Sequence, residues 1–228
     1  NLVKLGELLS EKGQWFFTME LVPGVDFLKF VEGTEAPDEN GEAPCANERK
    51  LRSALGQLAM GIKALHDAGK LHRDIKPSNI MVTEDERVVV LDSSLNSTLH
   101  DGTRDACENV PYNSPEEAAS SKVGPASDWY AVGTLLYEAL TGHLPFSGDA
   151  GQIMEAKSKQ LPPAPLSEFP NLPKDLNELC VQLLAINPQS RPSPKSILAA
   201  LTVGERSSAR RKTTSHFTQT IPFVGRSD

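Results

Sequence analysis

The residues best able to do chemistry together lie in the stretch His72-Arg73-Asp74-Ile75-Lys76-Pro77-Ser78-Asn79, with Asp92 a short way beyond it. Asp74 and Asp92 supply carboxylates, and Asn79 supplies an amide oxygen. Hard oxygen ligands of this kind suit Mg²⁺, which keeps its other positions for phosphate and water. If Asn79 and Asp92 share such an ion, Lys76 adds a mobile positive charge near a phosphoryl group in transfer. Asp74 is then left to orient a substrate hydroxyl and to accept its proton.

A helix is expected before this stretch, because apolar residues recur there in steps of four and three. The recurrence predicts an amphipathic helix over residues 48–68, and its apolar positions are Leu51, Leu55, Leu58, Ile62 and Leu65. Asn47 can cap the start of the helix, and Gly69 can end it. The chemistry-bearing loop therefore begins where a helix ends.

Two short β-runs follow the loop. Residues 80–82 and 88–91 are rich in Val, Ile, Leu and Met, and a polar turn separates them. This pattern predicts a β-hairpin. A hairpin brings its two outer ends together, so Asn79 at its entry and Asp92 at its exit are placed to share one divalent ion.

The rest of the first half contains one more hairpin and two loops. Residues 1–22 carry an aromatic and aliphatic run behind a turn at Lys12-Gly13-Gln14, which predicts a hairpin. Residues 32–48 are rich in Glu, Asp, Pro and Gly and are interpreted as an exposed acidic loop. Residues 92–126 lack helical periodicity and form a long loop, and long loops inside compact domains are functional or disordered.

Four helices are predicted after that loop. Residues 128–140 are apolar nearly all round, so this helix should be buried, and Gly142 should end it. The other three are expected near residues 149–159, 174–184 and 193–201. The last of them opens with a Ser-Pro pair that suits an N-cap and the first helical position.

Length and composition exclude several classes of protein. The 228 residues suit one large domain or two small ones, and 39% apolar residues fit a globular chain. The net charge of −7 argues against a nucleic-acid-binding chain, and no apolar run approaches the roughly 18 residues of a membrane span. Three cysteines without C-x-x-C spacing, Cys45, Cys107 and Cys180, suit a reducing cytoplasm and argue against a zinc site. The chain starts with Asn1, without Met or a signal peptide, so we expect it to be processed or cut from something longer.

The pattern H-R-D-x-K-P-x-N, with its hairpin and following Asp, resembles the catalytic loop of eukaryotic-like protein kinases. Four more matches follow in the order typical of that family. Residues 19–22 (MELV) resemble the gatekeeper and hinge, 114–116 (SPE) the A-P-E box, and 128–133 (DWYAVG) the start of the buried central helix of the C-lobe. Arg191 resembles the Arg that pairs with the Glu of that box. Lys76 resembles the serine/threonine form of the catalytic loop.

The resemblance implies a fold and a function. The fold is α+β and protein-kinase-like, with a mainly α-helical C-lobe and a remnant of N-lobe β-strands over residues 1–203. The hinge between the lobes falls near residues 20–24. The implied protein is a cytoplasmic serine/threonine protein kinase that uses ATP and Mg²⁺ to phosphorylate hydroxyls of a protein substrate.

Carried over residue by residue, the resemblance implies roles for the loop. Asp74 resembles the catalytic base, and Lys76 resembles the Lys that stabilises the phosphoryl group. Asn79 and Asp92 resemble the Mg²⁺ ligands. His72 is interpreted as a packed histidine that holds the loop, not as a catalytic group.

The resemblance also implies contacts with the nucleotide. Glu20 and Val22 would offer main-chain contacts to adenine, and Met81 would form the floor of the pocket. Asp26 would sit near the ribose or near a basic residue of the substrate.

Five further residues are given regulatory or structural roles by the same resemblance. Arg73 would pair with a phosphorylated activation segment, for which Thr103 is the candidate acceptor, or Arg73 simply ties down the loop and Thr103 is a solvated residue. Glu116 and Arg191 are expected to form a structural ion pair. Asp128 is expected to brace the backbone of the catalytic loop.

The sequence departs from the family's pattern in three places. No G-x-G-x-x-G loop and no V-A-I-K-like strand precedes the hinge, and Lys4 does not replace the latter, so we expect this chain to bind ATP poorly by itself and to be inactive alone. The D-F-G motif is Asp92-Ser93-Ser94. The G-T before the A-P-E region is Glu108-Asn109, where Asn109 can replace in part the Thr that hydrogen-bonds near the catalytic Asp and Lys. These departures keep open an alternative, a pseudokinase that acts as a regulatory or binding module.

The end of the chain differs in composition from the rest. Residues 204–220 are a Ser/Thr-rich basic linker, and residues 221–228 turn apolar again. Their Phe-Val-Gly-Arg at 223–226 resembles the box that opens AAA-type ATPase domains, which follow the kinase domain in some large bacterial-type signalling kinases. We therefore expect an intramolecular ATPase domain as a partner; the alternative is an accidental match in a linker.

Overall fold

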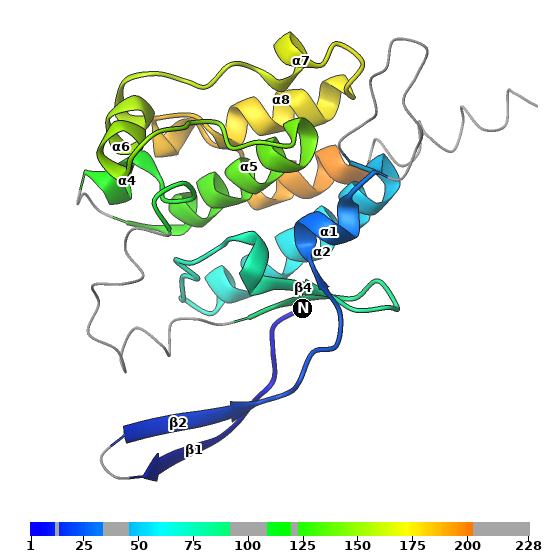
Figure 1. The fold of residues 1–228 in the computed structure, drawn as a ribbon, viewed down its shortest axis with the longest axis vertical. Helices are drawn as coiled ribbons and strands as arrows, with labels where there is room; N and C mark the ends of the chain where they lie inside the picture. Colours follow the sequence, from blue (N-terminus) through cyan, green and yellow to red (C-terminus); the bar gives the residue numbers. More distant parts are fainter. Residues whose placement is uncertain (12–13, 34–45, 92–108, 120–122, 203–228) are drawn as a thin grey trace, which may run out of the picture.

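The computed structural model describes residues 1–11, 14–33, 46–91, 109–119 and 123–202. These residues form a mixed helical and β-sheet structure, as expected. Figure 1 shows a helical body, a small sheet along one side of it and a two-stranded hairpin that projects away. None of the helices in these ranges is long and apolar enough to cross a membrane.

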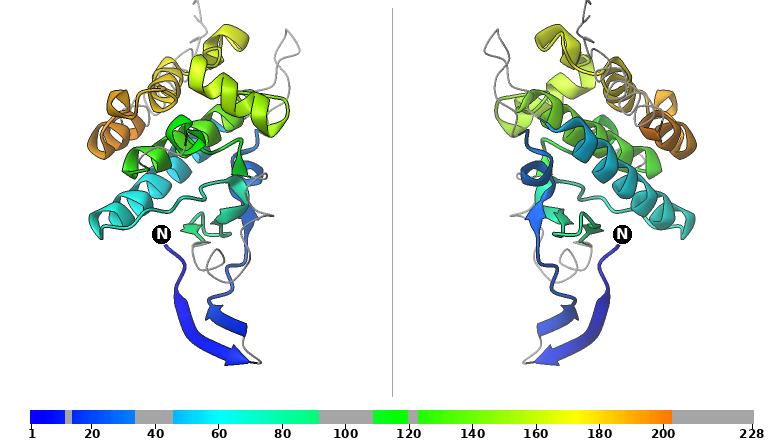
Figure 2. Two further views of the ribbon diagram at one scale, coloured as in Figure 1. Left: turned by 90° about the vertical axis from the view of Figure 1, so that its left-hand side faces the viewer. Right: turned by 90° about the vertical axis from the view of Figure 1, so that its right-hand side faces the viewer.

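The projecting hairpin pairs β1 (Leu5–Glu11) with β2 (Gln14–Met19) in antiparallel register. It forms where an aromatic and aliphatic run predicted it. The two views of Figure 2 show the hairpin at one end of the molecule and the helices gathered at the other. The hydroxyl of Thr18 accepts a hydrogen bond of 2.8 Å from the N–H of Glu7 and joins the two strands through a side chain.

The small sheet has the order β3-β4-β5 and is antiparallel throughout. Its strands are β3 (Val25–Asp26), β4 (Ile80–Val82) and β5 (Val88–Val90). The hairpin predicted after residues 72–79 is therefore confirmed, and it gains one strand from the chain before Phe27. The start of the chain extends the sheet beside β5, because the N–H of Val3 donates to the carbonyl of Val90 over 3.0 Å. The sheet is therefore held at both edges by the segment that precedes the helices.

The helix predicted at residues 48–68 is α2 (Glu48–Asp67). Its predicted cap is present, because the side chain of Asn47 accepts from the N–H of Lys50 over 3.1 Å. Gly69 adopts a φ of 71°, the left-handed conformation that ends a helix at little cost for glycine. The apolar stripe of α2 is buried in the main core, together with the short helix α1 (Phe27–Val31), which the sequence analysis did not predict.

The centre of the helical body is α5 (Pro125–Thr141), which is buried on nearly every side as predicted. It packs against α8 (Lys174–Leu183) through Gly133, where an added Cβ would lie 2.7 Å from the Cβ of Leu183. Only glycine allows this approach of the two helices. Gly142, with a φ of 78°, ends α5 as expected and donates to the carbonyl of Glu138.

The remaining helices are α4 (Pro115–Ala118), α6 (Ala150–Lys159), α7 (Pro165–Glu168) and the helix over residues 194–202, with one-turn 3-10 helices η1 (Pro77–Asn79) and η2 (Pro188–Ser190). The three helices predicted after α5 are thus confirmed. The hydroxyl of Ser193 caps the last one by accepting from the N–H of Ser196.

The interpretation of residues 92–126 as one continuous loop was wrong in its last part. Helix α4 forms there, and α5 begins at Pro125. The cause is a capping box, in which Ser114 accepts from the N–H of Glu117 while the Glu117 carboxylate accepts from the N–H of Ser114. Most of the predicted acidic loop, the linker at 204–220 and the apolar end at 221–228 lie outside the described residues.

Candidate active site

One buried carboxylate accepts main-chain hydrogen bonds from the loop that carries the predicted chemistry. Asp128, near the start of α5, is 2% exposed. Its two oxygens accept from the main-chain N–H groups of His72 over 2.9 Å and Arg73 over 2.8 Å. The ring of His66 on α2 lies 2.7 Å from the same carboxylate. Asp128 thus joins α5, α2 and the loop.

The charge of Asp128 is stabilised in place. Burial raises the pKa of this carboxyl. The hydrogen bonds from His66 and from the N–H groups of His72 and Arg73 lower the pKa, and together they outweigh the effect of burial. The net pKa lies below its ordinary value. The carboxylate is therefore the form that binds the loop, and an anion accepts hydrogen bonds more strongly than a neutral group does.

The loop has an unusual backbone at Arg73, whose φ is +65°. This left-handed conformation is uncommon for a residue with a Cβ. The hydrogen bond from Arg73 N–H to Asp128 helps to hold it. The Arg73 side chain is exposed, as a receptor for phosphate would need to be.

The ring of His72 connects this loop to the strand that leads to Asp92. Its Nε2 donates to the carbonyl of Leu91 over 2.9 Å, and its Nδ1 accepts from the N–H of Asp74 over 3.3 Å. These two bonds select the neutral tautomer protonated at Nε2. His72 is 2% exposed, which fits the interpretation of a packed histidine.

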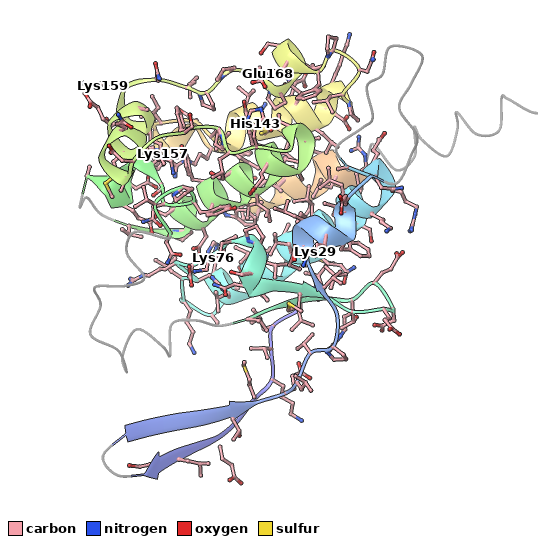
Figure 3. All side chains as sticks on the ribbon, in the orientation of Figure 1. Lys29, Lys76, His143, Lys157, Lys159 and Glu168 are labelled. Carbon is pink, nitrogen blue, oxygen red and sulfur yellow. The ribbon has the colours of Figure 1, made fainter. Side chains whose placement is uncertain are left out.

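Asp74, Lys76 and Asn79 come together at the end of the loop. The side-chain amide of Asn79 donates to Asp74 Oδ2 over 2.7 Å and to the Asp74 carbonyl over 2.8 Å. Lys76 Nζ lies 3.3 Å from Asp74 Oδ1, as an ion pair without hydrogen-bond geometry. Within the described part of the chain, Asp74 Oδ1 is buried and accepts no hydrogen bond. Figure 3 shows Lys76 beside η1.

Besides its ion pair with Asp74, Lys76 contacts Asn109, in the segment 109–114 that precedes α4. Its Nζ donates to Asn109 Oδ1 over 2.7 Å. Asn109 stands at the position where the resemblance expects Thr, and it reaches the Lys that the sequence analysis named. The loop at residues 72–79 and the segment before α4 are therefore linked through the Lys76 ammonium beside Asp74.

The predicted Mg²⁺ ligands can be placed only in part, because Asp92 lies outside the described residues, as does Thr103. Leu91, the residue before Asp92, donates its N–H to the carbonyl of Asn79 over 2.8 Å. The amide nitrogen of Asn79 is turned toward Asp74, which leaves its Oδ1 free of donors from the described residues. An amide oxygen beside the start of an acidic segment fits one position in the coordination of Mg²⁺.

The residues expected to contact the nucleotide lie between β2 and β3 and on the paired strands β3 and β4. The N–H of Glu20 is used within the protein, because it donates to the Lys4 carbonyl over 3.0 Å, so only the Glu20 carbonyl is left for a ligand. Val22 N–H has no acceptor among the described residues. Met81 is half-buried on β4 and is paired in register with Asp26 on β3.

Asp26 has two structural neighbours that the sequence analysis did not foresee. Its carboxylate caps α1 by accepting from the N–H of Lys29 over 3.0 Å. It also acts on Glu138 of α5. Burial raises the pKa of the Glu138 carboxyl, the hydrogen bond from Tyr112 lowers it, and the charge of Asp26 raises it, with a raised pKa as the net result.

Glu116 and Arg191 form a buried two-fold hydrogen-bonded ion pair at 2.6 and 2.8 Å. The Arg191 side chain is 1% exposed and also donates to the carbonyls of Ala126 and Ala185. Burial raises the pKa of Glu116, but Arg191 and Ser127 lower it below its ordinary value. The pair joins α4 to the chain after α8, and it therefore fixes the position of α4 against the helical body.

Sequence reasoning missed the buried Lys157 of α6. It is 1% exposed, and burial lowers its pKa to about 7, while Glu117 raises it. A lysine in a helix with a polar face is normally exposed to solvent, so the sequence pattern did not indicate that Lys157 is buried. His66 was missed as well, although it lies in the last turn of α2, where basic residues are favoured by the helix dipole.

Comparison with known proteins agrees with this geometry. A sequence profile of the family described as "Protein kinase domain" matches residues 1–201. The chain is 38% identical over 155 residues to a probable serine/threonine-protein kinase PkwA of Thermomonospora curvata, covering 66% of the chain and 20% of that protein. It is 33% identical over 200 residues to the serine/threonine-protein kinase pkn3 of Myxococcus xanthus, covering 81% of the chain and 35% of that protein.

A third relative is the serine/threonine-protein kinase PknE of Mycobacterium tuberculosis, 30% identical over 195 residues, covering 84% of the chain and 33% of that protein. The chain thus spans between a fifth and about a third of the length of these relatives. The profile match covers most of the sequence, and it includes the loop, the ion pair and the buried central helix described above. The chain therefore belongs to the protein kinase domain family.

Proposed function

We propose that this chain contains the larger part of the catalytic domain of a serine/threonine protein kinase, which transfers the γ-phosphoryl group of ATP to a protein hydroxyl. The observation that carries the proposal is the cluster of Asp74, Lys76 and Asn79, in which one oxygen of Asp74 is buried without a donor from the described residues. The family membership and the printed names of the relatives support it.

In this proposal the residues of the cluster divide the work. Asp74 Oδ1 accepts the hydrogen bond of the substrate hydroxyl and takes its proton as the new O–P bond forms. Lys76, 3.3 Å away, supplies positive charge beside the phosphoryl group as the bond to the leaving nucleotide breaks. Asn79 holds the other oxygen of Asp74, so the base keeps one orientation. Positioning of this kind supplies most of the catalysis in phosphoryl transfer.

ATP and Mg²⁺ are the cofactors of the proposed reaction. Asn79 Oδ1 and Asp92 would hold Mg²⁺, which neutralises phosphate charge when bound. Val22 N–H and the Glu20 carbonyl would take the adenine edge, with Met81 below the ring. Asp26, whose carboxylate lies 3.6 Å from Lys29 Nζ, would sit near the ribose or near a basic residue of the substrate.

The alternative is a pseudokinase that serves as a regulatory module, and a sequence feature favours it: Ser93 and Ser94 replace the Phe and Gly of the family motif. Restoring both residues separates the two functions. In a working kinase that is weakened by the loss of the packing of the Phe side chain, Ser93→Phe with Ser94→Gly should raise turnover or ATP affinity. A pair of substitutions that changes neither quantity would show that the Ser pair is tolerated.

We also propose a larger organisation around the kinase domain. Residues 1–203 form the kinase domain, 204–220 a linker and 221–228 the opening of an ATPase domain, in a protein of the cytoplasm. The Phe-Val-Gly-Arg at 223–226 and the cysteine usage support this. Binding of a fluorescent ATP analogue to two sites with separate affinities in the protein as its gene encodes it would test the organisation.

The proposed activity is tested with the same whole protein. It is incubated with Mg²⁺ and ATP labelled at the γ-phosphate and with a degenerate peptide library that contains Ser, Thr or Tyr as the only hydroxyl. Label on Ser and Thr peptides, lost when Mg²⁺ is chelated, is the expected result. Label on Tyr peptides alone, or release of free phosphate without labelled peptide, would contradict the proposal.

A further inference from the structure

The segment between Asn109 and α4 is held by one buried cation on another helix. Lys157 of α6 is 1% exposed, and its Nζ donates to the carbonyls of Val110 over 2.8 Å, Pro111 over 2.5 Å and Asn113 over 2.7 Å. Figure 3 shows Lys157 on the inner side of α6, facing α4 and the segment before it. An ammonium has three N–H donors, and here each has a main-chain acceptor.

The three carbonyls point to one place because the segment is a tight turn. The N–H groups of Tyr112 and Asn113 both donate to the carbonyl of Asn109, over 2.9 and 3.0 Å. The N–H groups of Tyr112 and Asn113 are therefore used inside the turn, while the carbonyls of Val110, Pro111 and Asn113 accept from Lys157 of α6. Without a donor from α6, these buried acceptors would lose their partners, which costs free energy.

Two further groups act on this ammonium. The ring of Tyr130 on α5 lies 5.3 Å from Nζ and adds an apolar and weakly attractive face. Glu117 of α4 is the charged group that favours the cation. Within the described ranges Lys157 has no carboxylate partner in an ion pair, so the turn is its binding partner.

The same segment forms a wall beside the proposed base. Asn109 accepts from Lys76 over 2.7 Å, and Lys76 is the ion-pair partner of Asp74. Asp74, Asn109, Tyr112 and Asn113 line one small cavity of about 10 Å³. These contacts place the turn beside the proposed base, so a polypeptide that brings its hydroxyl to Asp74 would dock next to the turn.

Resting on the proposed function, we propose that Lys157 is a positioning residue for the protein substrate. Its ammonium fixes the turn at residues 110–113 in the shape against which the polypeptide docks. Lys157 thus controls the affinity for the protein substrate and leaves ATP binding unchanged. It touches neither substrate nor nucleotide, and it acts through the turn.

The experiment compares Lys157→Met, Lys157→Arg and, as a matched control, Lys159→Met in the protein as its gene encodes it. Lys159 lies on the same helix, but its side chain is 68% exposed. Lys157→Met should raise KM for a peptide substrate by about tenfold or more, since three charged hydrogen bonds are lost, with KM for ATP unchanged. Lys157→Arg should raise it by a smaller factor, and Lys159→Met should leave both constants unchanged. Unchanged peptide KM in folded Lys157→Met, or equal rises in both constants, would overturn the proposal.

A second variant and a second measurement keep the claim decidable. If Lys157→Met does not fold, Lys157→Arg decides: a peptide KM raised about threefold with unchanged ATP KM supports the role, and an unchanged peptide KM overturns it. If the unsubstituted protein transfers no phosphate, the proposed function fails, and hydrogen exchange then tests the turn alone. Faster exchange of the Tyr112 and Asn113 amides in Lys157→Met than in Lys159→Met would keep the structural part of the claim, and equal exchange would end it.

Discussion

Lys76 donates to the side-chain oxygen of Asn109 over 2.7 Å, across 33 positions of sequence. The contact joins the loop that bears the proposed base to the turn before α4. The sequence resemblance expects Thr at position 109, so an amide oxygen would have to replace a hydroxyl as the acceptor for Lys76. The amide oxygen of Asn109 can serve as this acceptor, because it lies at an ordinary hydrogen-bond length from the Lys76 ammonium.

Replacement of Asn109 should therefore affect catalysis more than folding. Asn109→Ala removes an acceptor from a half-buried charged hydrogen bond, and we expect kcat to fall by about tenfold, which corresponds to roughly 1.4 kcal/mol. Asn109→Thr should keep at least half of the activity, because Thr supplies an acceptor at the same position. Steady-state kinetics with a peptide substrate, together with thermal unfolding, measures both effects. A kcat for Asn109→Ala equal to that of the unsubstituted protein would show that the contact is incidental.

The buried pair of Glu116 and Arg191 should be strongly stabilising against removal of one partner. Arg191→Met leaves the Glu116 carboxylate buried without its cation, which should lower the free energy of unfolding by about 3–5 kcal/mol. Arg49→Met breaks the exposed pair with Glu86, where the side chains are 66% and 38% exposed, and should cost less than about 1 kcal/mol. Urea unfolding of the two variants side by side measures this. Equal losses would contradict the role given to the buried pair.

The same pair predicts a pH dependence of stability. The pKa of Glu116 in the folded protein lies below its ordinary value of 4.5, so the folded state favours the charged carboxyl. The stabilisation from this shift is fully present above pH 4.5 and is lost as the pH falls through the lowered pKa of the folded state. The difference in unfolding free energy between the protein and its Glu116→Gln variant should therefore shrink in acid. A difference that stays constant from pH 7 to the acid limit of folding would count against the assignment.

Two glycines in helices should respond to alanine in opposite ways. At Gly133 a Cβ would lie 2.7 Å from that of Leu183, so Gly133→Ala should force α5 and α8 apart and cost about 1–3 kcal/mol. At Gly56 of α2 nothing lies within 4 Å of an added Cβ, so Gly56→Ala should stabilise the protein by roughly 0.5–1 kcal/mol. Thermal and urea unfolding of both variants gives the comparison. Shifts of the same sign would mean that the packing of α5 against α8 adapts more easily than its geometry suggests.

Local patterns predicted most elements of this fold. The steps of four and three gave α2 its apolar stripe, and Asn47 and Gly69 mark its ends as expected. Short elements were missed because one turn of helix carries too little periodicity to be recognised. α4 shows this, since it depends on the capping box of Ser114 and Glu117 more than on an apolar pattern.

The candidate site could be predicted where chemistry is local and could not where it depends on distant packing. The loop from His72 to Asn79 carries its chemistry in consecutive residues, so its types and spacing suffice. The burial of Lys157 results from three carbonyls more than 40 positions away, and no window of sequence contains them. The electrostatic effect of Asp26 on Glu138 is equally non-local, because 112 positions of sequence separate β3 from the last turn of α5.

The most direct test of the account is phosphoryl transfer by the Asp74→Asn variant of the protein as its gene encodes it. The amide is nearly the same size as the carboxylate but cannot take the proton of a substrate hydroxyl, while Asp67→Asn, on the exposed end of α2, controls for loss of a carboxylate. Labelled phosphate on Ser or Thr peptides is measured with Mg²⁺ and ATP, and thermal unfolding confirms that both variants are folded. The account predicts transfer by the unsubstituted protein and by Asp67→Asn, and loss of nearly all transfer in Asp74→Asn. Undiminished transfer by a folded Asp74→Asn protein would contradict it.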